Sequence, residues 1–124
     1  MRILAIDPGY DRMGIAVLEG NASHPTLVWS GCIQPPKGER EERLGVLSEA
    51  IRKTIQEYNP ERFVLETLYF GANKKTAIGV AEARGVALSL AGTFGVEVRE
   101  YAPSTVKLAV TGNGRADKKA IAAM

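Results

Sequence analysis

The chain is poor in the residues that build disulfides and zinc sites, and it has no apolar run near the roughly 20 residues that a membrane-spanning helix needs. Its one cysteine, Cys32, forms no intrachain disulfide, and with the one histidine, His24, it supplies too few ligands for a Cys/His zinc site. The apolar stretch within Met1–Asp7 is too short for a signal peptide. We therefore expect a cytoplasmic protein that has no membrane segment.

The composition indicates a folded domain with an uneven charge. The 124 residues are 45% hydrophobic and 24% charged, which excludes wholesale disorder and predicts a single domain over residues 1–124. Residues 1–60 carry seven basic and eight acidic side chains, whereas residues 61–124 carry nine and six. A basic half is typical of proteins that bind phosphate-bearing partners, although on charge alone a solvated surface of mixed charge is the commoner explanation.

Three short apolar segments begin the chain. Arg2–Ile6 is followed by the turn sequence Asp7-Pro8-Gly9, and Gly14–Leu18 resumes in extended form. Leu27–Ile33 alternates between apolar and other residues with the period of a strand. Short strands joined by turn-rich loops predict an antiparallel meander.

The period of the apolar residues then becomes helical. One stripe is formed by Leu44, Leu47, Ile51, Ile55 and Tyr58. The i,i+4 pairs Glu39/Arg43 and Glu49/Lys53 are expected on the solvent side of this helix, and Asn59-Pro60 is expected to end it.

Strands and helices alternate in the remainder. We predict strands at Phe63–Glu66 and Val96–Tyr101, with a helix from Lys75 to about Phe94 between them. Two further helices are predicted, one from Pro103 to before Gly112 and one over 116–124. The order β-β-β-α-β-α-β-α predicts an α/β fold with a five-stranded mixed sheet flanked by helices.

Two acidic residues each end an apolar strand. If the strands that end at Asp7 and Glu66 are parallel neighbours, both carboxylates lie at the same sheet edge. Paired carboxylates repel unless a cation lies between them, and oxygen ligands suit Mg²⁺ or Mn²⁺. The alternative for Asp7 alone is a turn residue that accepts backbone hydrogen bonds. Together the two acids favour a metal site.

The segment after Glu66 combines aromatic and basic residues. Tyr69 and Phe70 are followed by Asn73, Lys74 and Lys75, which predicts a loop that stacks on bases and contacts phosphates. The alternative is that one of the two aromatic rings packs beneath the loop as part of the core.

The second predicted helix is apolar around most of its circumference, which indicates burial on more than one side. In so small a domain, a partner subunit is one way to cover the second side, and packing beneath other helices is the other.

The motifs extend over the whole chain in a specific order. They are Ile6-Asp7-Pro8-Gly9 with Gly14, Gly31-Cys32-Ile33, Glu66-Thr67-Leu68-Tyr69-Phe70 with Asn73, Ala83-Arg84-Gly85-Val86-Ala87, Tyr101-Ala102-Pro103 with Val106-Lys107, and Thr111-Gly112-Asn113-Gly114 with Ala116 and Lys118. In this order and spacing they resemble the RuvC-type Holliday junction resolvases, which have the ribonuclease H-like fold.

The resemblance implies a homodimeric, metal-dependent endonuclease that nicks two opposed strands of four-way junction DNA in recombination and repair. It implies that Asp7 and Glu66 are catalytic metal ligands for Mg²⁺ or Mn²⁺, with two ions in a complete enzyme. Lys107 and Lys118 would act beside the scissile phosphate, and Tyr69 would stack at the opened junction centre. The implied partner besides DNA is the RuvA/RuvB branch-migration complex. Further DNA contacts are predicted for the basic residues Arg84, Arg115 and Lys119.

The end of the chain departs from the family pattern. The family continues to a final helix with the pattern Asp-Ala-x-Asp-Ala, whereas the 124 residues end at Met124. We expect this chain to be catalytically incomplete, because a second cation needs those aspartates. Two alternatives stay open, a junction-binding module without catalysis and another ribonuclease H-like nuclease such as a YqgF-like protein.

Overall fold

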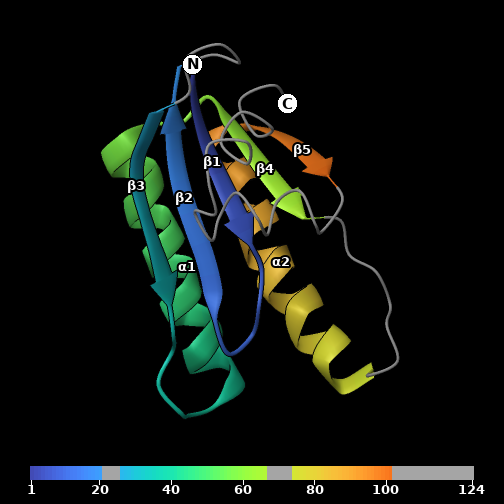
Figure 1. The fold of residues 1–124 in the computed structure, drawn as a ribbon. Helices are drawn as coiled ribbons and strands as arrows, with labels where there is room; N and C mark the ends of the chain where they lie inside the picture. The colour runs from blue at the N-terminus through green and yellow to red at the C-terminus, as the bar shows by residue number, and fades with distance from the viewer. Residues whose placement is uncertain (21–25, 67–73, 102–124) are drawn as a thin grey trace.

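A five-stranded mixed sheet forms the centre of the molecule (Figure 1). The computed structural model describes residues 1–20, 26–66 and 74–101. Its elements are β1 (Arg2–Asp7), β2 (Met13–Glu19), β3 (Thr26–Ile33), α1 (Arg40–Tyr58), β4 (Arg62–Glu66), α2 (Lys74–Phe94) and β5 (Glu97–Tyr101). The strand order is β3-β2-β1-β4-β5, with β1 to β3 antiparallel and β4 and β5 parallel to β1 and to each other. The predicted meander and mixed sheet are confirmed, and the helices predicted from Pro103 onward lie outside the described residues.

Both described helices cover the same face of the sheet (Figure 1). Alternate residues of β1 point to opposite faces, so Leu4 and Ile6 join the cluster beneath the helices, while Ile3 and Ala5 join a second buried cluster on the other face. A central strand that is buried on both faces is apolar throughout, which explains why β1 has no polar residue before Asp7 except Arg2 at its start.

Helix α2 packs on the core through small residues. Ala83, Ala87 and Ala91 recur every four residues, are fully buried, and let the helix approach the sheet closely. The segment Ala77–Phe94 has a mean hydropathy of 1.2 and is long enough, by length and composition alone, to cross a membrane, a test that core helices also pass. Only 17% of it is buried within this chain. The exposed large apolar side chains described on α2 are Ile78 and Phe94.

Helix α1 ends where the sequence predicts. Asn59 adopts a left-handed conformation with φ 52°, and its N–H donates to the carbonyl of Ile55 at 2.8 Å before Pro60 prevents continuation.

Of the two ion pairs predicted on α1, Glu39/Arg43 is wrong, and Glu49 has a nearer partner than Lys53. Arg43 does not pair with Glu39 on the solvent side, because its side chain points inward and reaches Asp11 at 3.0 Å. The direct ion pair of Glu49 is with Arg52 at i,i+3, and the charge of Lys53 makes a smaller contribution at Glu49. The Arg52 guanidinium holds the pKa of the Glu49 carboxyl below its usual range. Spacing on a helix permits several partners, and tertiary contacts choose among them.

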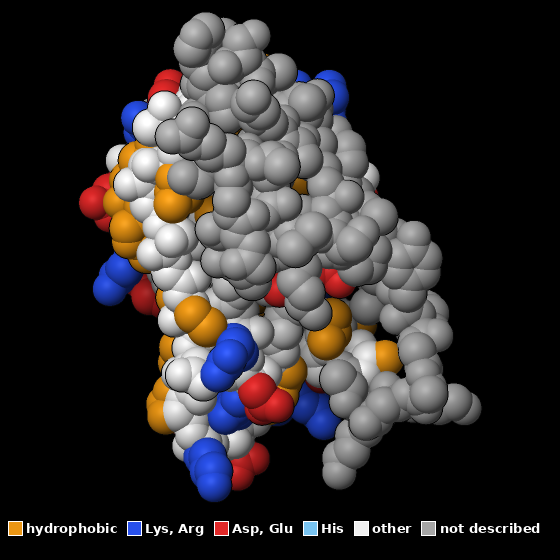
Figure 2. Space-filling model, viewed as in Figure 1, with side chains coloured by type: hydrophobic (Ala, Val, Ile, Leu, Met, Phe, Trp, Pro, Cys, Tyr) orange, Lys and Arg blue, Asp and Glu red, His pale blue; other side chains and the backbone are white. Residues whose placement is uncertain are grey.

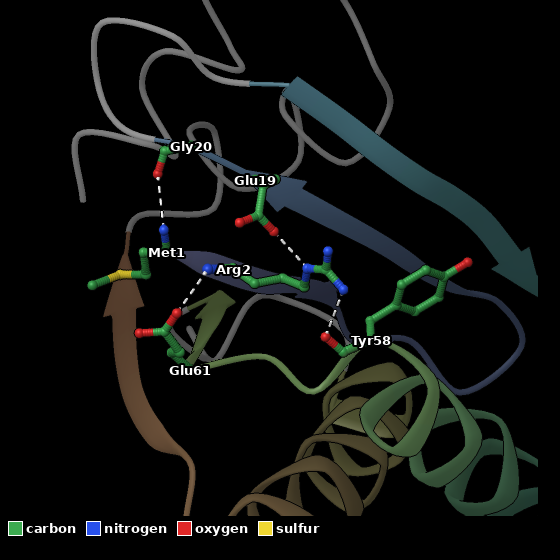
Figure 3. A network of polar contacts seen from close by, with 6 residues as sticks. All are labelled: Met1, Arg2, Glu19, Gly20, Tyr58 and Glu61. Carbon is green, nitrogen blue, oxygen red and sulfur yellow. Dashed lines mark hydrogen bonds and ion pairs between the residues drawn. The ribbon is translucent and has the colours of Figure 1, made fainter.

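A polar network fastens the N-terminal end of β1 (Figure 3). The guanidinium of Arg2 donates to the Glu19 carboxylate of β2 and, at 2.9 Å, to the Tyr58 carbonyl at the end of α1. Its hydrogen bond lowers the pKa of Glu19. The ring of Tyr58 stacks on Trp29 of β3 with centroids 6.1 Å apart. These contacts tie three strands and α1 together at the end of the sheet opposite Asp7.

Candidate active site

Asp7 and Glu66 end neighbouring parallel strands. Strand β1 pairs with β4 in a register whose last pair is Ile6 with Leu65, so the next residue of each strand is an acid. Ile6 and Leu65 belong to the cluster beneath the helices, and alternation therefore directs the two acids toward the opposite face of the sheet. Adjacent strands lie about 4.8 Å apart, which brings the two carboxyl groups to one edge. The predicted juxtaposition is confirmed.

Both acids directly follow buried apolar residues. Ile6 and Leu65 are fully buried, whereas Asp7 and Glu66 are half-buried at the strand ends. Carboxylate oxygens are hard donors that fit Mg²⁺ or Mn²⁺. Within the described ranges 1–20, 26–66 and 74–101, no group of three or more His, Cys, Asp and Glu residues gathers. The described part of the chain thus supplies a two-carboxylate donor set that fits a partly hydrated ion.

Arg84 of α2 lies against the ends of β4 and β5. Its Nε donates to the main-chain carbonyl of Glu66 at 3.4 Å, and its guanidinium pairs with the carboxylate of Glu100. The sequence reasoning missed Glu100, because a single acid on an exposed strand position has no distinctive pattern. A DNA contact by Arg84 stays a prediction.

The turn after Asp7 is closely packed. A side chain at Gly9 would place its Cβ 2.1 Å from the carbonyl oxygen of Arg12, so only glycine fits there. A Cβ at Gly79 of α2 would lie 2.8 Å from the Cβ of Tyr10, so the turn and helix meet where glycine leaves room. Sequence reasoning did not single out Tyr10.

A surface cleft of about 620 Å³ lies beside this turn. Its lining consists of Gly9, Tyr10, Asp11, Arg12, Arg40, Ile78, Gly79, Val80 and Glu82. Figure 2 shows basic and acidic side chains interspersed over this end of the molecule. Arg40 and Glu82 pair at 3.6 Å across α1 and α2. Among the described residues that line the cleft, two are acidic and two are arginines, so this part of the lining has no excess of either sign.

Several predicted site residues lie outside the described part of the chain. They are Tyr69, Phe70, Asn73, Lys107, Arg115, Lys118 and Lys119. Lys74 and Lys75 open α2, and the positions of their side chains are likewise outside the description. Their roles stay predictions.

Comparisons with known proteins agree with this geometry. The family model described as "Crossover junction endodeoxyribonuclease RuvC" matches residues 3–124. The crossover junction endodeoxyribonuclease RuvC of Thermotoga petrophila is 42% identical over 122 residues, which cover 98% of this chain and 74% of that protein.

Solved structures show the same architecture. The structure of T. thermophilus RuvC in complex with Holliday junction substrate has a TM-score of 0.79 at 25% identity, covering 98% of this chain and 90% of that chain. The yeast mitochondrial Holliday junction resolvase Ydc2, at 11% identity and a TM-score of 0.60, shares the fold, covering 97% of this chain and 75% of that one. The predicted ribonuclease H-like fold is confirmed. The chain therefore belongs to the crossover junction endodeoxyribonuclease RuvC family, whose members are endonucleases that resolve Holliday junctions.

Proposed function

We propose that this protein resolves four-way DNA junctions by metal-dependent nicking, with Asp7 and Glu66 as the metal ligands supplied by the described residues. The observation that carries this proposal is the position of both acids at the ends of two adjacent parallel strands. An open edge beyond the carboxyl ends of parallel strands is where α/β proteins bind their ligands. A charged DNA backbone reaches such an edge without entering the core.

The two carboxylates fit a hard divalent ion, and when bound there Mg²⁺ or Mn²⁺ would supply activation of water and stabilisation of charge on the phosphate. The sheet's part is to keep the two oxygen donors together, because β1 and β4 are hydrogen-bonded neighbours. We further propose that each site binds two ions, which the family resemblance supports. The same resemblance supports the RuvA/RuvB branch-migration complex as a partner.

The remaining site residues are proposed as DNA contacts on their residue types and family positions. Lys107 and Lys118 would hold the DNA near the scissile phosphate, since lysine is a compact positive charge that pairs with phosphate oxygens. Tyr69 and Phe70 offer rings for base stacking. Basic or polar contacts with the backbone are proposed for Asn73, Lys74, Lys75, Arg84, Arg115 and Lys119.

The proposal is tested by comparing a four-way junction with a linear duplex of the same sequence, in Mg²⁺ and in EDTA. We expect the full-length protein to bind the junction preferentially in both buffers and to cut it only in Mg²⁺. Gel shifts measure binding, and denaturing gels measure nicking. Junction binding without nicking in Mg²⁺ or Mn²⁺ would identify a binding module, and cleavage without junction preference would identify another nuclease of the same fold.

A homodimer through α2 completes the proposal. Ile78 is 58% exposed on this helix although it is apolar, and a two-fold dimer presents two identical sites to the two-fold symmetry of a junction. We expect Ile78→Glu to weaken dimerisation by at least about tenfold, because a buried unpaired carboxylate is costly. Sedimentation equilibrium measures the association constant.

The matched control for this variant is Val46→Glu. Val46 is 39% exposed on α1, so the substitution introduces the same charge on the surface of the other helix. A wild-type monomer, or an equal loss in the two variants, would contradict dimerisation through α2.

A further inference from the structure

Arg43 is a buried arginine at the junction of three chain segments. It belongs to the first turn of α1, and its side chain is only 9% exposed. The guanidinium donates to the carbonyls of Pro35 at 3.3 Å, Pro36 at 2.9 Å and Tyr10 at 3.4 Å. It also donates to the carboxylate of Asp11 at 3.0 Å. One side chain thus links α1, the loop before α1 and the turn between β1 and β2.

The ring of Tyr10 completes this contact. The guanidinium carbon of Arg43 lies 4.8 Å from the centroid of the Tyr10 ring, within the range of a cation–π interaction. Tyr10 also packs at Gly79 of α2, where a Cβ would lie 2.8 Å from its own Cβ. The turn is therefore held between α1 on one side and α2 on the other.

The partners differ in what they contribute. The Asp11 side chain is 92% exposed, and an ion pair with so exposed a carboxylate is weak. The three carbonyls and the ring take the place of water around the buried charge. This arrangement needs the planar fork of an arginine, because a lysine ammonium is compact and cannot donate in several fixed directions while lying flat over a ring.

The clamped turn directly follows Asp7. Asp7 is the last residue of β1, and it pairs with Gly14 of β2. Glu66 ends β4, which is paired on both sides, with β1 and β5. Beyond Asp7 the chain leaves the sheet, so contacts of the turn act together with the sheet pairing to set how this end of β1 lies relative to Glu66.

We propose that Arg43 is a positioning residue that holds the turn after Asp7, and through it the Asp7 carboxylate, in the geometry that the site requires. This inference rests on the proposed role of Asp7 as a metal ligand. Arg43 acts through the backbone of the turn and contacts neither DNA nor the cleaved phosphate. Residues that hydrogen-bond to metal ligands act in a similar way. Removing such a residue lowers metal affinity or activity although the ligand itself is still present.

The test compares Arg43→Lys with Asp11→Asn. Lysine keeps the charge and loses the fork, whereas Asp11→Asn removes the exposed ion pair and leaves the carbonyl and ring contacts. In a complete enzyme, we expect Arg43→Lys to raise the Mg²⁺ concentration for half-maximal junction cleavage by about tenfold, as removal of residues that support metal ligands does. Asp11→Asn should stay within about twofold of wild type, because the ion pair is exposed. Junction affinity in EDTA should be unchanged in both variants.

Hydrogen exchange provides a readout that is independent of metal and cleavage. In Arg43→Lys, the backbone amides of residues 9–13 should exchange about tenfold faster, while those of β4 keep their wild-type rate, since local opening is confined to the turn. If exchange and the Mg²⁺ requirement both match wild type, Arg43 does not position the turn. If Arg43→Lys does not fold, Tyr10→Leu, which removes the ring under the guanidinium, decides the question with the same two measurements.

The two proposals fail in different ways. Cleavage that survives Asp7→Asn would overturn the role of Asp7, whatever Arg43 does. Faster exchange of the turn with an unchanged Mg²⁺ requirement would show that Arg43 holds the turn but that the site does not depend on it, which overturns the positioning role.

Discussion

In a complete enzyme, Glu66→Gln is expected to abolish junction cleavage. We expect a loss of at least about a hundredfold, which corresponds to several kcal/mol of transition-state stabilisation. The amide has nearly the shape of the carboxylate and can still accept hydrogen bonds, so the fold should be unaffected. What it loses is the negative charge that holds a divalent ion beside Asp7. Single-turnover cleavage of a labelled four-way junction in Mg²⁺ measures the effect.

Junction affinity should respond in the opposite direction or hardly at all. The substitution removes one negative charge next to the DNA backbone, so binding in EDTA should stay within about threefold of wild type or tighten. Glu57→Gln is the matched control, since Glu57 is an exposed acid on α1 remote from both strand ends. Cleavage by Glu66→Gln at a rate near that of Glu57→Gln would refute the metal assignment.

Phe63→Ala should lower the free energy of unfolding by about 3–5 kcal/mol, the usual cost of deleting a buried ring. Phe63 lies in β4, is fully buried, and belongs to the cluster between the sheet and both helices. Because a domain of this kind is stable by only about 5–15 kcal/mol, this one change removes a large share of its stability. Urea unfolding followed by circular dichroism, at one fixed protein concentration, gives the value.

Phe94→Ala provides the comparison with the same residue type. Phe94 ends α2 and is 38% exposed, so its truncation should cost less than about 1 kcal/mol. Equal losses in the two variants would mean that β4 is not the centre of the core. Since β4 also carries Glu66 three residues later, loosening at Phe63 should reach the site before it reaches β3 at the sheet edge.

Local patterns in the sequence were enough to predict every described strand and helix to within a few residues. The period of two in Leu27–Ile33 and the period of three and four from Leu44 to Tyr58 reflect which side of each element is buried, and burial is what the pattern encodes. The Asn59-Pro60 stop is equally local, because a proline beyond the first turn of a helix removes a backbone hydrogen bond and clashes with the preceding turn.

Predicting that Asp7 and Glu66 are adjacent required the sheet topology in addition to the local pattern. Each acid after an apolar strand is visible in the sequence, but their meeting depends on β1 and β4 being parallel neighbours. The order of elements favours that topology, since a strand, a helix and a strand build a parallel pair. The prediction succeeded because the topology is regular.

The contacts of Arg43 and Arg84 were decided by the tertiary structure alone. In the sequence, Arg43 is four residues after Glu39 and is predicted to face solvent. In the fold its side chain is buried between α1 and the turn after Asp7. Arg84 is predicted as a DNA contact, and the fold sets it against the ends of β4 and β5. The periodic pattern of a helix or strand indicates on which face of that element a side chain lies. The partners of the side chain come from segments far apart in the chain, and only the packed structure brings them within reach.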